Sequence, residues 1–566
     1  MGNAQMVAAS AHSSDHNTLP ATLGSAVTFQ ERLGGGQFLK SVKCMNEDGA
    51  LVVKIYSKRH AVSLSSYEEM LAEVRQLLTL NGSPNVMPFR WFKETPQAAY
   101  LVRQYFHQNL LERMGTPPFL MPVEKRWLAF QLLQAVQQCH AVGVCHGDIK
   151  CENVMVTSWG WVFLCDLANF KPQSLPQDDP TNFNYFFCSA RKGCAVAPER
   201  FTETATADGA PGARDVGLQP ASDVFSCGCV LLELFNEAGP PFELPQLLRY
   251  TRGEPMLDAA LSSVRPAELG RLLGSMTHRD PKARPTAEKC LRHARGGVLD
   301  ECFYSFAFGF FMRLRLMDQP SQADELCECF EMLVRELRPC PPAATPAAAA
   351  ADDTAALTAR AAKAVGSTTG YLRRAEEEMR VSAEQAAASG SDAKGGARGA
   401  ASTVAAAAAV AALAADRVSK EENASTARAR HAVRTESALV LVVTSMCAAV
   451  RNVPSTHLKL SLMRRLVEVS FECEDALCTQ RVLPYLVSML SDAAPLVRAE
   501  AVRLTASLLE AVDTLQPMYV PPRYLLHMAP SATSLSCPSC MLQPACAAHP
   551  RLHPTRSHLV SAGIRA

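Results

Sequence analysis

The chain has 566 residues, of which 48% are hydrophobic and 20% are charged, and its formal net charge at pH 7 is +1. Single cores stop growing near about 300 residues, so this length predicts at least two folded domains and connecting linkers. The balanced charge gives no electrostatic reason to expect nucleic acid as a partner. The 20 cysteines show no disulfide-like spacing and follow no charged-then-apolar leader, which favours a reducing, cytoplasmic setting.

The first 28 residues are small and polar, and we expect them to be disordered. Removal of Met1 would expose the amine of Gly2, which N-myristoylation requires, and a myristoyl group would bring the chain to a membrane surface. Met6 stands where that motif prefers Ser or Thr, so an ordinary disordered start is the alternative interpretation. No polybasic run follows that would supply the second signal for stable anchoring.

Residues 29–310 change from strand-rich to helical patterns. Short β-rich runs at Leu51–Tyr56 and Tyr100–Val102 precede helical periodicity, as at Glu124–His140. This order predicts an α+β domain in which a strand-rich lobe precedes a helical lobe.

The rest of the chain is predicted to be helical or irregular. The apolar run Ala438–Val450 is too short to cross a bilayer, which needs about 20 residues. Helices separated by a turn at Asp492 and Pro495 have the form of a HEAT repeat, and a truncated all-α HEAT-type solenoid is expected there. The predicted order is a helical extension at 311–340, an Ala-rich linker at 341–430, HEAT-like repeats at 431–518 and an irregular tail at 519–566.

Two early motifs suggest a phosphate site. In LGGGQFLKSV, the glycines Gly34 and Gly36 would let backbone amides approach phosphates, although Leu39 stands where a third glycine is usual, and a Gly-rich hairpin turn is the alternative. In VVKI, Lys54 lies in a predicted strand and would bind the α and β phosphates. On the following helix Glu73 is its expected carboxylate partner, with the neighbouring acidic positions Glu68 and Glu69 as alternatives.

The stretch HGDIKCENVMV matches the catalytic loop of protein kinases, except that Gly147 replaces an arginine. There Asp148 would accept the proton of a substrate hydroxyl, Lys150 would steady the transferred phosphoryl group, and Asn153 would hold a magnesium ion. Asp166, in the triplet DLA, would be the second metal ligand. The missing arginine normally binds an activation-loop phosphate, so ordering of the loop by phosphorylation is not expected.

Three further residues have scaffold roles in this pattern. Glu199 in APE is expected to pair with Arg284 in RDPKARP, and Asp223 in SDVFSCG fits an aspartate at a helix start. Each residue alone is more often an ordinary surface or core group. Their order along 29–310 predicts a bilobal protein kinase fold that binds ATP, or another purine nucleotide, and Mg²⁺.

The amino-acid sequence between the motifs is more distinctive than the motifs themselves. HGDIKCENVMVTSWGWVFLCDLANFKP and DPTNFNYFFCSARKGCAVAPERF, followed by helical repeats, closely resemble the regulatory, kinase-domain subunit of the class III phosphatidylinositol 3-kinase complex. The resemblance implies HGD in place of HRD, an atypical glycine loop and a myristoylated Gly2. It also implies partnership with the lipid kinase catalytic subunit and a Beclin-type subunit, on endosomal and vacuolar membranes, in vacuolar sorting and autophagy.

The sequence leaves two functions open and also contains one possible zinc site. Retention of Lys54, Glu73, Asp148, Asn153 and Asp166 favours an active Ser/Thr protein kinase. The altered glycine loop, the DLA triplet and the solenoid instead favour a nucleotide-binding scaffold without catalysis. Cys537, Cys540, Cys546 and His549 also have a spacing that allows tetrahedral zinc binding, but no helix or hairpin pattern surrounds them.

Overall fold

The computed structural model describes residues 27–35, 38–57, 65–96, 98–168, 170–188, 191–202, 218–236, 239–338 and 437–512. The predictions for Gly2, Gly36, the linker, the tail and the cysteine and histidine cluster at 537–549 lie outside these residues and stay predictions. In the described part of the chain, no helix combines the length and the apolar character that a membrane crossing requires.

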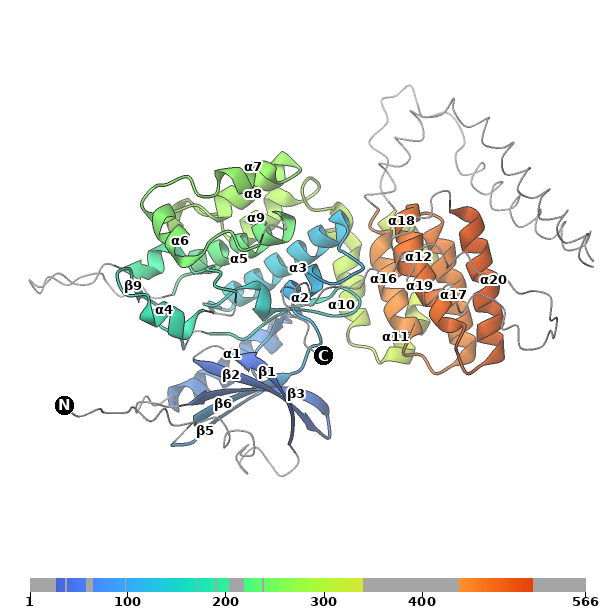
Figure 1. Cartoon of the computed structure of the whole chain (residues 1–566), viewed down its shortest axis with the longest axis horizontal. Helices are drawn as coiled ribbons and strands as arrows, with labels where there is room; N and C mark the ends of the chain where they lie inside the picture. Colours follow the sequence, from blue (N-terminus) through green and yellow to red (C-terminus); the bar gives the residue numbers. More distant parts are fainter. Residues whose placement is uncertain are drawn as a thin grey trace, which may run out of the picture. The chain divides into compact units, whose positions relative to one another are not determined.

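The first lobe is a five-stranded antiparallel sheet in the order β1-β2-β3-β6-β5 (Figure 1). Its strands are β1 (Thr28–Gly35), β2 (Leu39–Asn46), β3 (Gly49–Ser57), β5 (Trp91–Glu94) and β6 (Ala98–Gln104). The predicted strand-rich lobe is therefore confirmed. Alternate residues of β6 belong to two different hydrophobic clusters, so both faces of this strand are covered.

One helix covers a face of this sheet. Helix α1 (Ser65–Leu80) places Tyr67 and Leu71 in a buried cluster with Phe92, Ala99 and Leu101 of the sheet. The ring of Tyr67 meets that of Phe92 edge to face, with 5.1 Å between centroids. This packing fixes the side of β3 and β6 that faces away from solvent.

The second lobe is mostly helical, and α3 (Pro122–Ala141) runs through it (Figure 1). Trp127 and Phe130 of α3 are buried with Trp161, Phe303 and Phe311 in an aromatic core. The other helices of this lobe are α2 (Leu110–Met114), α4 (Thr181–Phe186), α5 (Pro220–Asn236), α6 (Leu244–Thr251), α7 (Asp258–Ser263), α8 (Ala267–Met276), α9 (Ala287–Ala294) and α10 (Phe308–Leu314).

Two small sheets complete this lobe. The first has the order β4-β8-β7 and is formed by β4 (Val86–Met87), β7 (Val154–Val156) and β8 (Val162–Cys165). The second pairs β9 (Leu175–Pro176) with β10 (Phe201–Thr202) in parallel. The β7–β8 hairpin matters for function because the HGDIKCEN stretch leads into β7 and Asp166 follows β8 directly.

The remaining helices form a bundle from two parts of the chain that are far apart in sequence. They are α11 (Gln319–Glu328), α12 (Phe330–Leu337), α16 (Leu439–Val450), α17 (Thr456–Ser470), α18 (Asp475–Leu477), α19 (Leu483–Met489) and α20 (Pro495–Ala511). Helix α11 packs against α16 and α17, and α12 packs against α16. The guanidinium of Arg465 on α17 lies over the ring of Phe330 on α12, 4.6 Å from its centroid. The segment predicted as a helical extension thus shares its core with the segment predicted as repeats.

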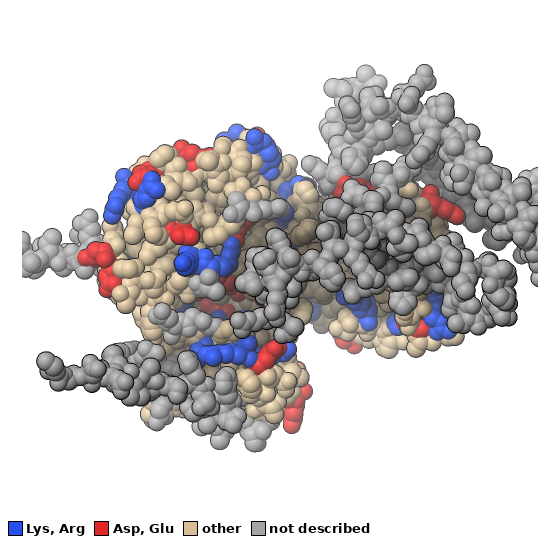
Figure 2. Space-filling model, in the orientation of Figure 1, with Lys and Arg blue, Asp and Glu red and all other residues tan. Residues whose placement is uncertain are grey.

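The described surface carries no extended area of one charge on the face drawn in Figure 2, where basic and acidic side chains are interspersed. This distribution agrees with a formal net charge of +1.

Candidate functional site

A cleft between the sheet lobe and the helical lobe gathers most of the predicted residues. Lys54 of β3 contributes from the sheet side, and Asp148, Lys150, Asn153 and Asp166 contribute from the helical side. Gly34 also lines this cleft, with a φ of +120° that favours glycine. Residues that are up to 132 positions apart in the sequence, from Gly34 to Asp166, therefore meet in one cavity.

Asp166 is paired with two cations of the sheet lobe. It follows β8 with a φ of +67°, and its side chain is only 6% exposed. The Nζ of Lys54 lies 2.6 Å from its Oδ2. Arg103 forms a forked pair with it, since Nε donates to Oδ1 at 2.7 Å and Nη2 donates to Oδ2 at 3.2 Å. Burial favours the neutral acid, but Arg103 and Lys54 outweigh it and hold the pKa of Asp166 well below its usual value.

The prediction that Glu73 is the carboxylate partner of Lys54 was wrong. Glu73 lies exposed on α1, whereas the ammonium group of Lys54 is paired with Asp166 across the cleft. The two alternatives, Glu68 and Glu69, are also exposed on α1. The periodicity of α1 placed Tyr67, Leu71 and Val74 against the sheet and left the acidic positions to solvent.

Asp148 is held by two lysines and an amide. Lys171 Nζ donates to its Oδ2 at 2.7 Å, and Lys150 Nζ lies 3.3 Å from the same oxygen. Asn153 Nδ2 donates to the main-chain oxygen of Asp148 at 2.7 Å and to its Oδ2 at 3.2 Å. Burial alone would raise the pKa of Asp148, but Lys150 and Lys171 lower it to about 2. The carboxylate is therefore permanently ionised near neutral pH and is a weak proton acceptor.

Asp223 of α5 binds the backbone of the loop that carries Asp148. Its Oδ2 accepts from the backbone N of His146 at 2.7 Å, and its Oδ1 accepts from the N of Gly147 at 2.9 Å. His140 Nε2 lies 3.1 Å from Oδ2. Asp223 lies in the first turn of α5, as expected for an aspartate at a helix start, and there it binds the backbone of the catalytic loop.

Gly147, the position where kinases carry arginine, has a φ of +80°. A Cβ there would lie 2.9 Å from Cδ2 of Leu218. Another arginine binds this loop: Arg200 Nη1 donates to the carbonyl oxygen of Gly147 at 2.7 Å, and its Nη2 donates to that of Pro172 at 2.7 Å. Backbone carbonyl oxygens therefore occupy N–H donors of the Arg200 guanidinium.

The predicted pair of Glu199 and Arg284 is confirmed. The two side chains form a forked pair with both N···O distances at 2.8 Å, and Ser222 Oγ donates to the same carboxylate at 2.7 Å. Arg284 is fully buried at its side chain. The pair joins the APE segment to the connection between α8 and α9.

An aromatic cluster lines part of the cleft. Phe38 follows the glycine-rich strand and is buried, and its ring lies 4.6 Å from that of Tyr56 and 4.7 Å from that of Phe186, between centroids. Phe170 and Tyr185 complete the cluster at 6.1 and 5.7 Å. Tyr185 and Phe186 belong to α4, so Phe38, between β1 and β2, packs directly on the segment between Asp166 and Glu199.

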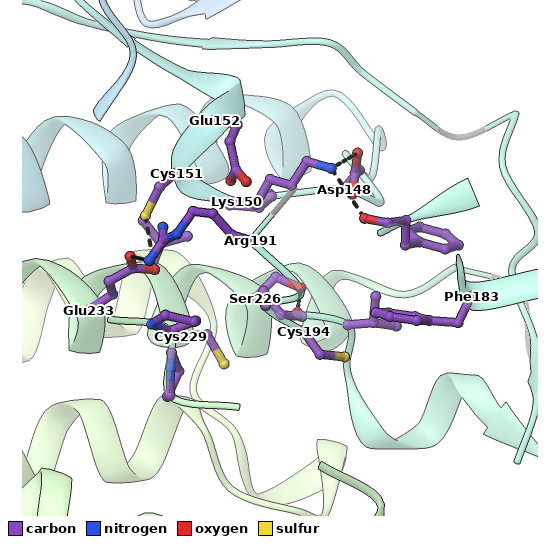
Figure 3. Close-up of a pocket in the computed structure, with 18 of the residues that line it drawn as sticks. Asp148, Lys150, Cys151, Glu152, Phe183, Arg191, Cys194, Ser226, Cys229 and Glu233 are labelled. Carbon is purple, nitrogen blue, oxygen red and sulfur yellow. Dashed lines mark hydrogen bonds and ion pairs between the residues drawn. The ribbon is translucent and has the colours of Figure 1, made fainter. Parts of the chain in front are cut away.

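A second pocket lies next to Asp148 and Lys150, under the catalytic loop (Figure 3). In it Arg191 points to the buried Glu233 of α5, with 2.5 Å between Nη2 and Oε1. Cys151 Sγ donates to the other oxygen of Glu233 at 3.4 Å. An arginine of the chain itself therefore neutralises the acid at the base of this pocket.

Two functional residues escaped the sequence analysis. Arg103 and Lys171 contact the two acids of the cleft more closely than most of the predicted partners do. Arg103 lies in YLVRQYF and Lys171 lies in LANFKP, but neither residue belongs to a motif with an assigned role. Only their spatial positions reveal them.

Family models agree with this geometry. Residues 27–294 match the protein kinase domain, and residues 442–548 match the PIK3R4-like middle domain. The chain contains a protein kinase domain. The kinase fold predicted from the order of motifs, with its sheet-rich first lobe and helical second lobe, is confirmed, and so is an α+β class with a following helical region.

Relatives with assigned names are similar over the kinase domain. Serine/threonine-protein kinase VPS15 of Arabidopsis thaliana is 45% identical over 282 residues, which are 50% of this chain and 19% of the relative. The probable serine/threonine-protein kinase vps15 of Dictyostelium discoideum is 40% identical over 312 residues, 54% of this chain and 16% of the relative. The VPS15 of Saccharomyces cerevisiae is 34% identical over 296 residues, 51% of this chain and 20% of the relative.

The matched region therefore spans a fifth or less of the length of these relatives. The pairing of a kinase domain with a PIK3R4-like middle domain confirms the resemblance to the kinase-like regulatory subunit of the phosphatidylinositol 3-kinase complex.

Proposed function

We propose that this chain is a regulatory, Ser/Thr protein kinase-like scaffold of the class III phosphatidylinositol 3-kinase complex, acting in vacuolar and endosomal sorting and in autophagy. One observation carries the proposal: Lys54, Asp148, Asn153 and Asp166 meet in one cleft of a kinase domain whose chain continues into a PIK3R4-like middle domain. The lipid kinase catalytic subunit is the proposed partner, with a Beclin-type subunit beside it.

In this proposal the cleft holds ATP or another purine nucleotide. Lys54 and Lys171 attract the phosphates, and Gly34 lets the strand above approach them. The hydroxyl of a bound serine or threonine would face Asp148, and Lys150 would neutralise the phosphoryl group in transit. A Mg²⁺ ion, where it is bound with the nucleotide, would supply charge neutralisation of the phosphates. Asn153 lies where its amide oxygen can serve as a ligand, but both oxygens of Asp166 are already engaged by Arg103 and Lys54.

A second candidate is a catalytically inactive scaffold that holds nucleotide. Two contacts favour it: Lys171 on Asp148, and Arg103 on Asp166. Both contacts occupy groups that phosphoryl transfer needs, so this scaffold is expected to bind nucleotide without transferring its phosphate; in the first proposal transfer is weak, or directed at the chain itself or its partner.

The complex is tested by co-expression of the full chain with the lipid kinase catalytic subunit, followed by purification through a tag on the chain. Retention of the subunit through size exclusion supports the scaffold, and its complete loss contradicts it. Arg271→Met, on the exposed surface of α8, is the matched control and should not change the yield.

Phosphoryl transfer is tested separately by incorporation of labelled phosphate from ATP into the complex. The control is Asp148→Ala, which removes the proposed base. Incorporation that depends on Asp148 supports a working kinase, and equal incorporation by both chains supports the inactive scaffold.

Gly2 and the membrane are part of the same proposal. We infer that a myristoyl group on Gly2 helps to hold the chain on endosomal or vacuolar membranes. Mass spectrometry of the N-terminal peptide tests this, with Gly2→Ala as the control. A fully unmodified glycine in chain purified from eukaryotic cells contradicts it.

A further inference from the structure

The register of two neighbouring strands brings a second cation to Asp166. In the antiparallel pair of β3 and β6, Val52 is opposite Arg103 and Lys54 is opposite Leu101. Residues opposite each other share a face of the sheet, so Lys54 and Arg103 are diagonal neighbours on the cleft side. The strand pattern alone therefore directs both side chains to the same place.

The Arg103 guanidinium is held on two sides. Its Nη1 donates to the carbonyl oxygen of Gln104 at 3.0 Å, and its Nε and Nη2 bind the two oxygens of Asp166. Its side chain is 7% exposed, and that of Asp166 is 6% exposed. A planar guanidinium fits both oxygens of a carboxylate at once, and such forked pairs are stronger than a single contact. The position that a metal ion would need on Asp166 is thus filled by a fixed side chain.

The charges around the two acids of the cleft do not balance. Asp166 is paired with Lys54 and Arg103, and Asp148 is paired with Lys150 and Lys171. Five cations and four acids line the whole cleft, because Arg191, Glu112 and Glu152 also face it, and together they leave a net charge of +1. A divalent cation added to this cluster meets repulsion, whereas a triphosphate without metal meets attraction.

We propose that Arg103 takes the place of the divalent cation at Asp166, so that the cleft binds nucleoside triphosphate without requiring Mg²⁺. Arg103 neutralises Asp166, and the lysines neutralise the phosphates. Metal reaches Asp166 only after Arg103 has left it. The inference rests on the proposed binding of nucleotide and adds to it the source of the neutralising charge.

The test is equilibrium binding of a fluorescent ATP analogue to the full chain, measured in EDTA and in millimolar Mg²⁺. The unsubstituted chain should bind with nearly equal affinity in both. In Arg103→Met, which frees the oxygens of Asp166, affinity in EDTA should fall by at least about tenfold and Mg²⁺ should restore it, a change equal to about 1.4 kcal/mol. Arg103→Lys keeps the charge but not the fork and should lie between the two.

Arg271→Met is the matched control, because it makes the same chemical change at an exposed position on α8 that pairs with Glu268. It should behave as the unsubstituted chain does. A second measurement follows Mn²⁺ by electron paramagnetic resonance in the presence of the nucleotide analogue. The unsubstituted chain should take up little Mn²⁺, and Arg103→Met should take up more.

Two results separate failure of this inference from failure of nucleotide binding. Binding by the unsubstituted chain only when Mg²⁺ is present overturns the role of Arg103 and leaves nucleotide binding in place. Absence of binding in both solutions overturns nucleotide binding itself, and the inference with it. The comparison on the unsubstituted chain needs no variant, so a poorly folded Arg103→Met does not remove the test.

Discussion

Arg481 of the helical bundle binds Glu124 in the first turn of α3, with Nη1 donating to Oε1 at 2.7 Å. The side chains of both residues are only 6% exposed. Thr444 of α16 donates to the same carboxylate, and Arg481 also donates to the carbonyl oxygen of Phe119 at 2.9 Å. The contact joins the kinase domain to the region with the PIK3R4-like match through a buried pair of charges.

Loss of one member of this pair should be costly. Arg481→Met leaves a buried carboxylate without its counter-charge, and we expect a loss of about 3–5 kcal/mol in the free energy of unfolding. Urea denaturation of the full chain measures it. The double variant with Glu124→Met should recover part of the loss; full recovery is not expected, because Glu124 Oε2 also accepts from the backbone N of Met121.

The control for this prediction is Arg464→Met, which removes an ion pair with Glu500 from a side chain that is 59% exposed. Such pairs contribute about 0–1 kcal/mol, so the two arginines should differ clearly. Equal losses for Arg481→Met and Arg464→Met would show that the buried pair has no special role.

Gly147→Ala should destabilise the chain for two reasons that can be separated. The positive φ costs an L-residue about 1–2 kcal/mol, and the new methyl group also meets Leu218 at 2.9 Å. Gly143→Ala is the control, since Gly143 has a φ of +74° and nothing lies within 4 Å of the added Cβ. Thermal unfolding should show a larger loss at 147 than at 143, and Leu218→Ala should reduce the difference.

Asp223→Ala should loosen the loop that carries Asp148. It leaves two buried backbone N–H groups, those of His146 and Gly147, without their acceptor, and each such loss costs about 1–3 kcal/mol. Hydrogen exchange should show faster exchange of these two amides. Asp258→Ala, at an exposed position in the first turn of α7, should leave their exchange unchanged; slow exchange in Asp223→Ala would sink the assignment.

Nucleotide binding should weaken as the pH rises through about 8. Burial, only partly offset by Asp148, lowers the pKa of Lys171 to about 8. Below that pH the ammonium form attracts phosphates, and above it the neutral amine does not. Bound phosphates favour the charged form, so binding near pH 8 should take up protons.

Calorimetry in buffers of different ionisation enthalpy measures this proton uptake directly. Lys171→Met should remove most of the pH dependence between pH 7 and 9. Lys289→Met, outside the cleft on α9, is the matched control and should keep it. An unchanged pH profile in Lys171→Met would assign the titration to another group.

The sequence predicted the site residues that belong to ordered motifs. The kinase fold brings the middle of β3, the start of β7 and the end of β8 to one cleft. This is why Lys54, Asp148, Asn153 and Asp166 converge there, since each belongs to a motif at one of these three places. The pair of Glu199 and Arg284 was predictable for the same reason.

The remaining contacts depend on tertiary geometry that no local pattern encodes. The predicted partner of Lys54, Glu73, lies exposed on α1. Lys54 instead forms a cluster with Asp166 and Arg103, which only the tertiary structure brings together. Arg103 reads as one charged residue at the end of an apolar strand, and only the register with β3 shows that it faces the cleft. The partnership of α11 and α12 with α16 and α17 likewise spans about a hundred residues of sequence.

That partnership has a consequence for the covalent continuity of the chain. The backbone leaves the bundle after α12 at Leu337 and re-enters it at Leu439, and helices from both sides of this interval share one core. Arg338 also pairs with Glu472 across the interval, at 3.0 Å. A single proteolytic nick between these points would therefore yield two polypeptides that co-elute as one particle, and new residues spliced in there would lengthen the connection without separating the halves.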